Sequence, residues 1–96
     1  MPNIISNLNK SFDSRIRLGI MSILSVNESA DFNTIKELLD LTDGNLASHI
    51  KALEGLEYIQ STKQFIGKKP NTKYTITEKG RKSFKEHLDA LESLIR

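Results

Sequence analysis

Apolar residues recur every three or four positions along much of this chain, which is the spacing of amphipathic helices. From Asp13 to about Val26 they sweep an arc of roughly 220° on a helical wheel, more than one core face requires. We therefore expect this helix to be buried on two sides, with Asp13 as its N-cap. A shorter stripe before it predicts an amphipathic helix over residues 2–11. That stripe consists of Ile4, Ile5, Leu8 and Phe12.

Two further helices follow, with only a short turn between them. After a polar turn at Asn27–Asp31, either Asp31 or Asn33 can cap a helix that ends near Leu41. Thr42 is a good N-cap for the next helix. Two short helices joined so closely form a helix-turn-helix, which holds the second helix at a steep angle with its outer face free. The apolar stripe of that second helix consists of Leu46, Ile50, Leu53 and Leu56.

The outer face of the second helix is small and polar. Opposite its apolar stripe lie Gly44, Ser48, Lys51, Ala52 and Gly55. Such residues suit close approach to a groove, and they suit solvent equally well. The face alone therefore carries little functional weight.

Strand-forming residues come next and predict a β-hairpin. Tyr58–Ile66 and Thr72–Thr77 are rich in β-branched and aromatic residues, and the basic stretch Gly67–Asn71 between them is interpreted as the turn. A hairpin directly after a helix-turn-helix is a wing. The predicted fold class is therefore mainly α with a small β-hairpin (α+β), a winged helix-turn-helix.

The two ends of the chain are unusually apolar for so small a domain. Thr77 can cap a final helix that runs from Glu78 to about Ile95. With Ile4, Ile5 and Leu8, this helix offers more apolar surface than one small core covers. We therefore expect a symmetric homodimer, helix on helix across a two-fold axis; the alternative is that both ends fold back on their own protomer. The apolar residues of the final helix are Phe84, Leu88, Leu91 and Ile95.

Charge is distributed unevenly, although the net charge is only +2. Residues 1–50 carry four basic and six acidic side chains, whereas residues 51–85 carry nine basic and three acidic ones, a local balance of +6. This asymmetry indicates a surface for a polyanion, and a solvated lysine face is the plainer alternative.

Composition excludes several classes of protein. A chain of 96 residues is one ordinary domain, residues 1–96, and without cysteine it has neither disulfides nor thiolate metal sites. No apolar run is long enough to span a bilayer and no secretory signal is present, so we expect a cytoplasmic protein without a membrane partner. Neither His49 nor His87 belongs to a cluster with the spacing of metal ligands or a catalytic triad. We therefore expect no cofactor and no enzymatic activity.

Three blocks of the sequence carry a resemblance to a known family. They read DSRIRLGIMSIL, FNTIKELLDLTDGNLASHIKALEGLEYI and QFIGKKPNTKYTITEKGRKSF, and they lie within residues 12–92. The blocks resemble small prokaryotic winged-helix transcriptional regulators, similar to the MarR and ArsR groups. The resemblance is closest to the minimal domain that ends in one dimerising helix. It implies a DNA-binding core at 12–77, a wing at 58–77, and terminal helices for dimerisation at 2–11 and 78–96.

Two features depart from these regulators. They usually have glycine in the left-handed position that ends the third helix, where this chain has Glu57. Either Glu57 adopts that conformation or the helix ends differently. The metal ligands of the ArsR type are also missing, because the chain has no cysteine and only two histidines.

The resemblance implies double-stranded DNA as the partner, with an inverted-repeat operator bound by a homodimer. A helix in the major groove reads base edges, while lysines and backbone amides bind phosphates. Asn45 and Ser48 are candidates for base edges, with plain surface as the alternative, and Lys51 for a phosphate or a guanine. The predicted recognition-helix contacts are Thr42, Asn45, Ser48, His49 and Lys51.

His49 and the wing have structural alternatives too. His49 falls between Leu53 and Leu56 on the wheel, so a part-buried histidine satisfied by a backbone group is an equal alternative to a phosphate contact. The wing lysines could simply be a solvated cluster that discourages aggregation. The predicted wing contacts are Lys68, Lys69, Asn71 and Lys73.

A competing hypothesis is a winged-helix module that docks a protein through the same face or through its terminal helices, since the fold does not decide the partner. DNA binding requires the lysines and weakens steeply with salt, whereas docking tolerates their loss. No constellation of residues identifies a site for a small-molecule effector.

Overall fold

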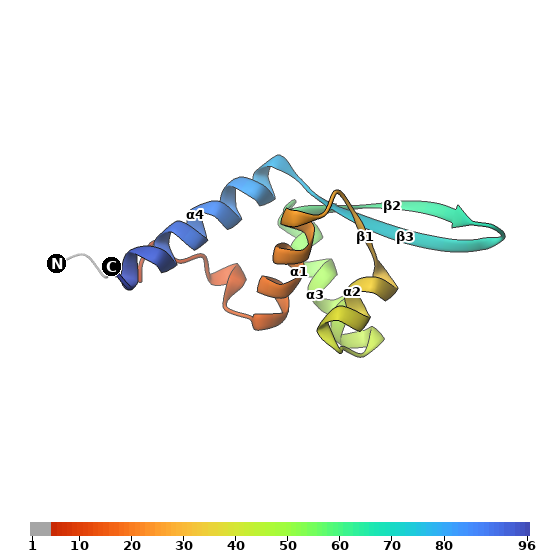
Figure 1. Cartoon of the computed structure of the whole chain (residues 1–96), viewed down its shortest axis with the longest axis horizontal. Coiled ribbons are helices and arrows are strands. Elements are labelled where there is room, and N and C mark those ends of the chain that lie inside the picture. Colours follow the sequence, from red (N-terminus) through yellow and green to blue (C-terminus); the bar gives the residue numbers. More distant parts are fainter. Residues whose placement is uncertain (1–4) are drawn as a thin grey trace.

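A computed structural model describes residues 5–96 of the chain. The elements follow the predicted order, and the winged helix-turn-helix is confirmed (Figure 1). The molecule is elongated, 58 × 25 × 22 Å, because the hairpin and the last helix extend in opposite directions from the central helices. The elements are η1 (Lys10–Phe12), α1 (Arg15–Val26), β1 (Ala30–Asp31), α2 (Phe32–Leu39), α3 (Asp43–Gly55), β2 (Ile59–Ile66), β3 (Lys69–Ile76) and α4 (Glu78–Leu94).

The helix predicted over residues 2–11 is wrong in its described part, which is a turn followed by the 3-10 helix η1. The Asn9 side chain accepts a hydrogen bond from the Ser11 N–H at 2.9 Å, and its own N–H donates to His87 Nδ1 at 2.9 Å. These bonds replace those of an α-helix. Asp13 ends η1, and Ser14 instead caps α1. Ile4 lies outside the described residues.

Three other helix starts are confirmed at their capping residues. Asp31, rather than Asn33, caps α2, and Thr42 and Thr77 cap α3 and α4. In each case the side-chain oxygen accepts the backbone N–H three residues later, which satisfies a donor that has no partner within the helix. These caps set where each helix begins.

The core surrounds α1, as its wide apolar arc predicts. α1 contacts α2, α3, α4 and β3, and Gly19 lies on the side of α1 that faces Leu39 of α2. A Cβ built on Gly19 would lie 2.7 Å from Leu39 Cδ2. The largest fully buried side chains come from η1 and the three central helices. They are Phe12, Ile20, Met21, Leu24, Ile35, Leu46 and Leu53.

The hairpin is longer and its turn tighter than the sequence predicted. β2 and β3 pair from Ile59↔Ile76 to Ile66↔Lys69, which leaves only Gly67 and Lys68 in the turn. Of these two, only Gly67 has a positive φ, +65°, the pattern of a type II′ turn. The predicted turn Gly67–Asn71 is therefore wrong in its second half.

A third strand, absent from our prediction, lies beside the hairpin. β1 pairs with β3 through Ala30↔Tyr74 and Asp31↔Lys73, in the order β1-β3-β2. Both of its residues fall in the segment predicted as a polar turn, because two residues carry no strand periodicity. Pro70, which lacks an N–H, lies beyond the end of β1, where no third strand needs its donor.

Glu57 does adopt the left-handed conformation, with φ +64°. Its N–H donates to the Glu54 carbonyl at 2.9 Å, and the Tyr58 N–H donates to the Leu53 carbonyl at 3.0 Å. This pair of bonds is the Schellman motif, which ends α3 and turns the chain into β2. Asp40, with φ 52°, ends α2 in the same way. Both helices of the helix-turn-helix thus end on a left-handed residue that is not glycine.

Candidate nucleic-acid interface

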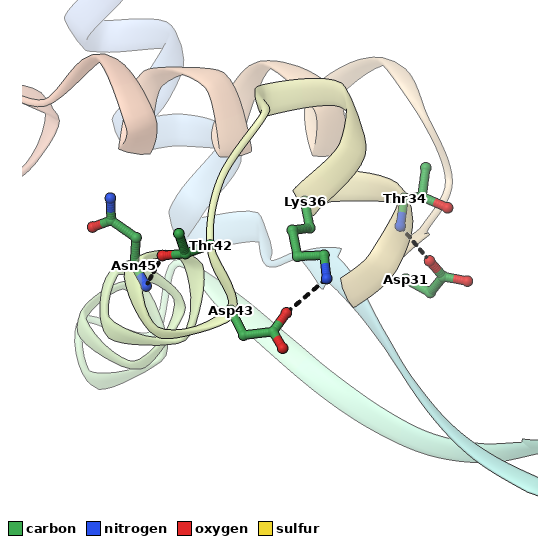
Figure 2. Close-up of polar contacts among 6 residues, drawn as sticks. All are labelled: Asp31, Thr34, Lys36, Thr42, Asp43 and Asn45. Carbon is green, nitrogen blue, oxygen red and sulfur yellow. Dashed lines mark hydrogen bonds and ion pairs between the residues drawn. The ribbon is translucent and has the colours of Figure 1, made fainter.

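The inner and outer faces of α3 differ as predicted. Leu46, Ile50 and Leu53 are buried, whereas Asn45 and Lys51 on the outer side are exposed. Ser48 is exposed as well, and nothing lies within 4 Å of a Cβ built on Gly44. Figure 2 shows the Asn45 side-chain amide extending away from the ribbon, while its backbone N–H is used by the Thr42 cap at 3.2 Å. The outer face therefore offers polar groups on a surface that permits close approach.

The N-terminus of α3 is tied to α2 by an ion pair. Lys36 Nζ lies 2.8 Å from Asp43 Oδ1, and Figure 2 shows Lys36 reaching from α2 to the first residue of α3. This lysine offsets the negative charge of Asp43, which would otherwise oppose the approach of a phosphate. Sequence reasoning missed the contact because the two residues lie seven positions apart across a turn.

His49 has a partner in α1. The Arg17 Nε–H donates to His49 Nδ1 at 3.1 Å, and Arg17 also donates to the Ser11 carbonyl at 3.4 Å. His49 is therefore part-buried, as one of the two alternatives predicted, but its hydrogen-bond partner is the Arg17 side chain and not a backbone group. Burial, and then the positive charge of Arg17, lower the pKa of His49 below its usual value. Because Nδ1 accepts, the neutral ring carries its proton on Nε2.

The wing carries four lysines, one more than the sequence prediction named. Lys68 in the turn and Lys69 beside it are exposed, and Lys73 is half-buried near the base. Lys63 on β2 is also exposed, and its inclusion in the basic segment 51–85 was the available signal. Lys69 and Lys73 share one face of the hairpin and Lys63 lies on the other. The hairpin that carries them extends away from the helices (Figure 1).

Asn71, the remaining predicted wing residue, is bonded within the protein at both ends of its amide. Its Oδ1 accepts from Gln64 Nε2 at 2.9 Å, and its Nδ2 donates to Asp31 Oδ2 at 3.3 Å. Unlike the exposed lysines, the side chain is half-buried.

The residues predicted for the dimer interface fall into two groups. Phe84 is only 5% exposed, and its ring packs against Phe12 with centroids 5.6 Å apart, so it belongs to the core of its own chain. This corrects the prediction, because helical spacing cannot distinguish two faces that both carry apolar residues. The others are at least partly exposed, namely Ile5, Leu8, Leu88, Leu91 and Ile95.

His87 is a structural residue that sequence reasoning did not identify. It is 3% exposed, its ring meets that of Phe12 edge-on with centroids 5.2 Å apart, and its Nδ1 accepts the Asn9 N–H. Asn9 in turn donates through Nδ2 to the Tyr58 hydroxyl at 3.1 Å. This network fastens the N-terminal segment to α4.

Within residues 5–96, no group of three or more His, Asp or Glu side chains could hold a metal ion. None of the helices described there combines the length and the apolar character needed to cross a membrane.

Comparison with known proteins agrees with this geometry. A family model described as a winged helix DNA-binding domain matches residues 16–95. An uncharacterized protein of Methanocaldococcus jannaschii is 40% identical over 79 residues, 82% of this chain and 86% of that protein. A transcriptional regulator homologue from Pyrococcus horikoshii has a TM-score of 0.84 at 36% identity, covering 96% of this chain and 89% of that chain.

A DNA-bound structure has the same fold. Reduced AbfR bound to DNA has a TM-score of 0.76 at 20% identity, over 94% of this chain and 64% of that chain. The solved neighbours also include a putative transcriptional regulator from Salmonella typhimurium, and winged-helix regulators are not enzymes. Because the family model extends from α1 to the end of α4, this protein belongs to the winged helix DNA-binding domain family.

Proposed function

We propose that this protein is a transcriptional regulator that binds double-stranded DNA sequence-specifically as a homodimer. The observation that carries the proposal is the combination of an exposed polar face on α3 with a lysine-bearing wing, in a chain of the winged helix DNA-binding family. The 36% identity to a regulator homologue over nearly the whole of both chains supports the same function.

In this proposal α3 lies in the major groove. Asn45 and Ser48, on its first two turns, read base edges, and Lys51 binds a phosphate or a guanine. The N-terminus of α3, with Thr42, adds its positive dipole end near the phosphates. His49 donates from Nε2 to a phosphate while Arg17 holds Nδ1. The helix thus combines base reading with backbone positioning.

The wing supplies the second contact. Lys68 and Lys69 extend on the turn of the hairpin to phosphates or into the minor groove, with Lys73 and Asn71 nearer the base. Cations at the end of a long hairpin reach phosphates beyond those that α3 covers. The DNA-binding core is thus residues 12–77, with the wing at 58–77.

Dimerisation is assigned to the two ends of the chain. Leu88 is 45% exposed and Ile95 is 85% exposed, and Leu91 lies between them on α4. Ile5 and Leu8, from the N-terminal segment, are at least partly exposed and are assigned to the same interface. A two-fold axis through it would present two α3 helices to half-sites about one helical turn apart, and hence to an inverted repeat.

Selection of bound sequences from a random duplex pool, repeated over a salt series, tests the proposal. We expect an inverted repeat with half-sites about one turn apart, lost steeply as salt rises. Retention of no sequence, even at low salt, would refute DNA binding and favour the protein-docking alternative.

A variant pair then locates the surface. K68A/K69A is expected to weaken binding and to reduce the slope of log K against log salt by up to about two. K10A/K85A removes the same charge from η1 and α4, and is expected to leave affinity nearly unchanged. Equal losses in both pairs would overturn the assignment of the wing.

A further inference from the structure

The outer part of the hairpin, residues 63–72, has little to hold it at a fixed angle to the helices. β1 ends at Asp31, opposite Lys73, so beyond that point β2 and β3 pair only with each other. Most side chains in this stretch are exposed. A hairpin supported on neither face would swing relative to α3.

One polar chain crosses the sheet where the third strand ends. Gln64 on β2 donates to Asn71 on β3 at 2.9 Å, and Asn71 donates to Asp31 on β1 at 3.3 Å. The strand register brings these three side chains together. Gln64 lies directly opposite Asn71, and Asp31 lies opposite Lys73, which is two residues after Asn71 on the same face of the sheet. Among the side-chain hydrogen bonds of residues 5–96, Asn71–Asp31 is the one that joins residues 63–72 to the rest of the chain.

Asp31 connects this chain to the helix-turn-helix. Its second oxygen, Oδ1, accepts the Thr34 N–H at 2.7 Å and so caps α2, as Figure 2 shows. α2 is joined in turn to α3 by the Lys36–Asp43 ion pair. A single carboxylate therefore holds the start of α2 with one oxygen and the wing with the other.

We infer that Asn71 is a positioning residue, which fixes the angle between the wing and the reading helix rather than contacting DNA itself. Both ends of its amide are occupied, so a direct contact would require breaking one of these bonds. This inference rests on the proposed DNA-binding function and refines the role of one predicted wing contact. A fixed angle matters because α3 and the wing must meet the same duplex in register.

Exchanging the side chains at positions 31 and 71 tests the inference. Asn71→Asp places a carboxylate against Asp31, so the bond is lost and the two charges repel. In the double variant D31N/N71D, the amide introduced at position 31 can still cap α2 through its oxygen and donate through its nitrogen to the carboxylate introduced at position 71. That carboxylate still accepts from Gln64. The double variant keeps the net charge of +2 and the same residue at position 71 as the single variant.

Hydrogen exchange of the free protein is the first measurement. We expect N71D to speed the exchange of backbone amides in residues 63–72 while α3 amides are unchanged, and D31N/N71D to restore protection. Unchanged wing exchange in N71D would overturn the inference. This result does not depend on DNA, so it stands apart from any failure of the proposed function.

Affinity for the selected operator is the second measurement. We expect N71D to lose about tenfold in specific affinity and D31N/N71D to recover most of it. If the double variant is as weak as N71D, Asn71 contacts DNA directly and the inference is wrong. If the unmodified protein binds no duplex, the proposed function fails, while the exchange result still decides whether Asn71 holds the wing.

Discussion

α3 and the wing, the two parts proposed to contact DNA, are held in place by different forces. α3 is anchored by Leu46, Ile50 and Leu53, which are 0%, 3% and 0% exposed. At the base of the wing, Ile59 and Tyr74 still belong to the hydrophobic core. Its outer part is held by backbone pairing and polar contacts, and Phe65 near the tip is 74% exposed. The reading helix therefore depends on the hydrophobic core, whereas the outer part of the wing can change without unfolding the domain. This contrast can be tested at four levels.

The largest effect is expected from truncating one side chain in each region. Leu53→Ala removes a fully buried side chain and is expected to lower the free energy of unfolding by about 3 kcal/mol. Phe65→Ala is expected to change it by less than about 0.5 kcal/mol. Urea denaturation of both variants measures the difference. Similar losses would show that the wing belongs to the same packed unit as α3.

Base specificity provides the second contrast. Asn45→Ala is expected to lower affinity for the preferred half-site about tenfold while leaving random duplex binding nearly unchanged, because only base contacts carry sequence information. K68A/K69A is expected to weaken binding to the preferred half-site and to random duplex about equally. Competition binding with the selected and scrambled duplexes measures the ratio. If Asn45→Ala lowers affinity for the selected and the scrambled duplex equally, Asn45 does not contact a base.

The third test concerns Glu57, the left-handed residue that joins α3 to the wing. Glu57 has φ +64°, which is strained for a residue with a Cβ, so Glu57→Gly is expected to stabilise the protein by about 0.5–1 kcal/mol. Glu54→Gly, inside α3, is the matched control and is expected to cost about 1 kcal/mol. Thermal unfolding compares the two, and destabilisation by both would contradict the assignment of a strained helix end.

The smallest effect is expected from pH, which titrates His49 of α3 and Asp31, the residue that holds the wing, in different ranges. The lowered pKa of His49 means that the unfolded chain takes up its proton first, so stability falls as the pH drops below about 6.5. Hydrogen bonds from Thr34, and less so from Asn71, lower the pKa of Asp31 below 3.8. The contribution of ionised Asp31 to the free energy of unfolding is therefore lost only as the pH falls below about 4.

His49→Gln isolates the first of these titrations. Between pH 7.5 and 5.5, the urea midpoint of the unmodified protein is expected to fall more than that of His49→Gln. Parallel falls in both proteins would assign the pH dependence to other groups. Asp31 stays ionised throughout this range, so the wing anchor does not contribute.

Local pattern predicted the helices better than it predicted the chain ends. The caps at Thr42 and Thr77 were found because a capping oxygen needs only a backbone N–H three residues away. The helix predicted at 2–11 is wrong in its described part, residues 5–11, because His87, on α4, takes the N–H of Asn9. Phe84 was assigned to a second chain because its packing on Phe12 is invisible in helical spacing.

The candidate site divides in the same way. The exposure of Asn45, Ser48 and Lys51 could be predicted, since a stripe of apolar residues defines the opposite face of the helix. The Arg17 partner of His49 and the Asp31 partner of Asn71 could not, because 32 and 40 residues separate the members of these pairs.

Periodicity and capping act within a turn or two of chain, so the sequence alone predicts the helix-turn-helix, the hairpin, the last helix and the face of α3 that stays in water. The α1 cap, the strand β1, the way the wing is held and the apolar residues kept for the protomer's own core follow only from the folded chain. Those outcomes depend on contacts between distant segments, and such contacts form only when the whole core has packed.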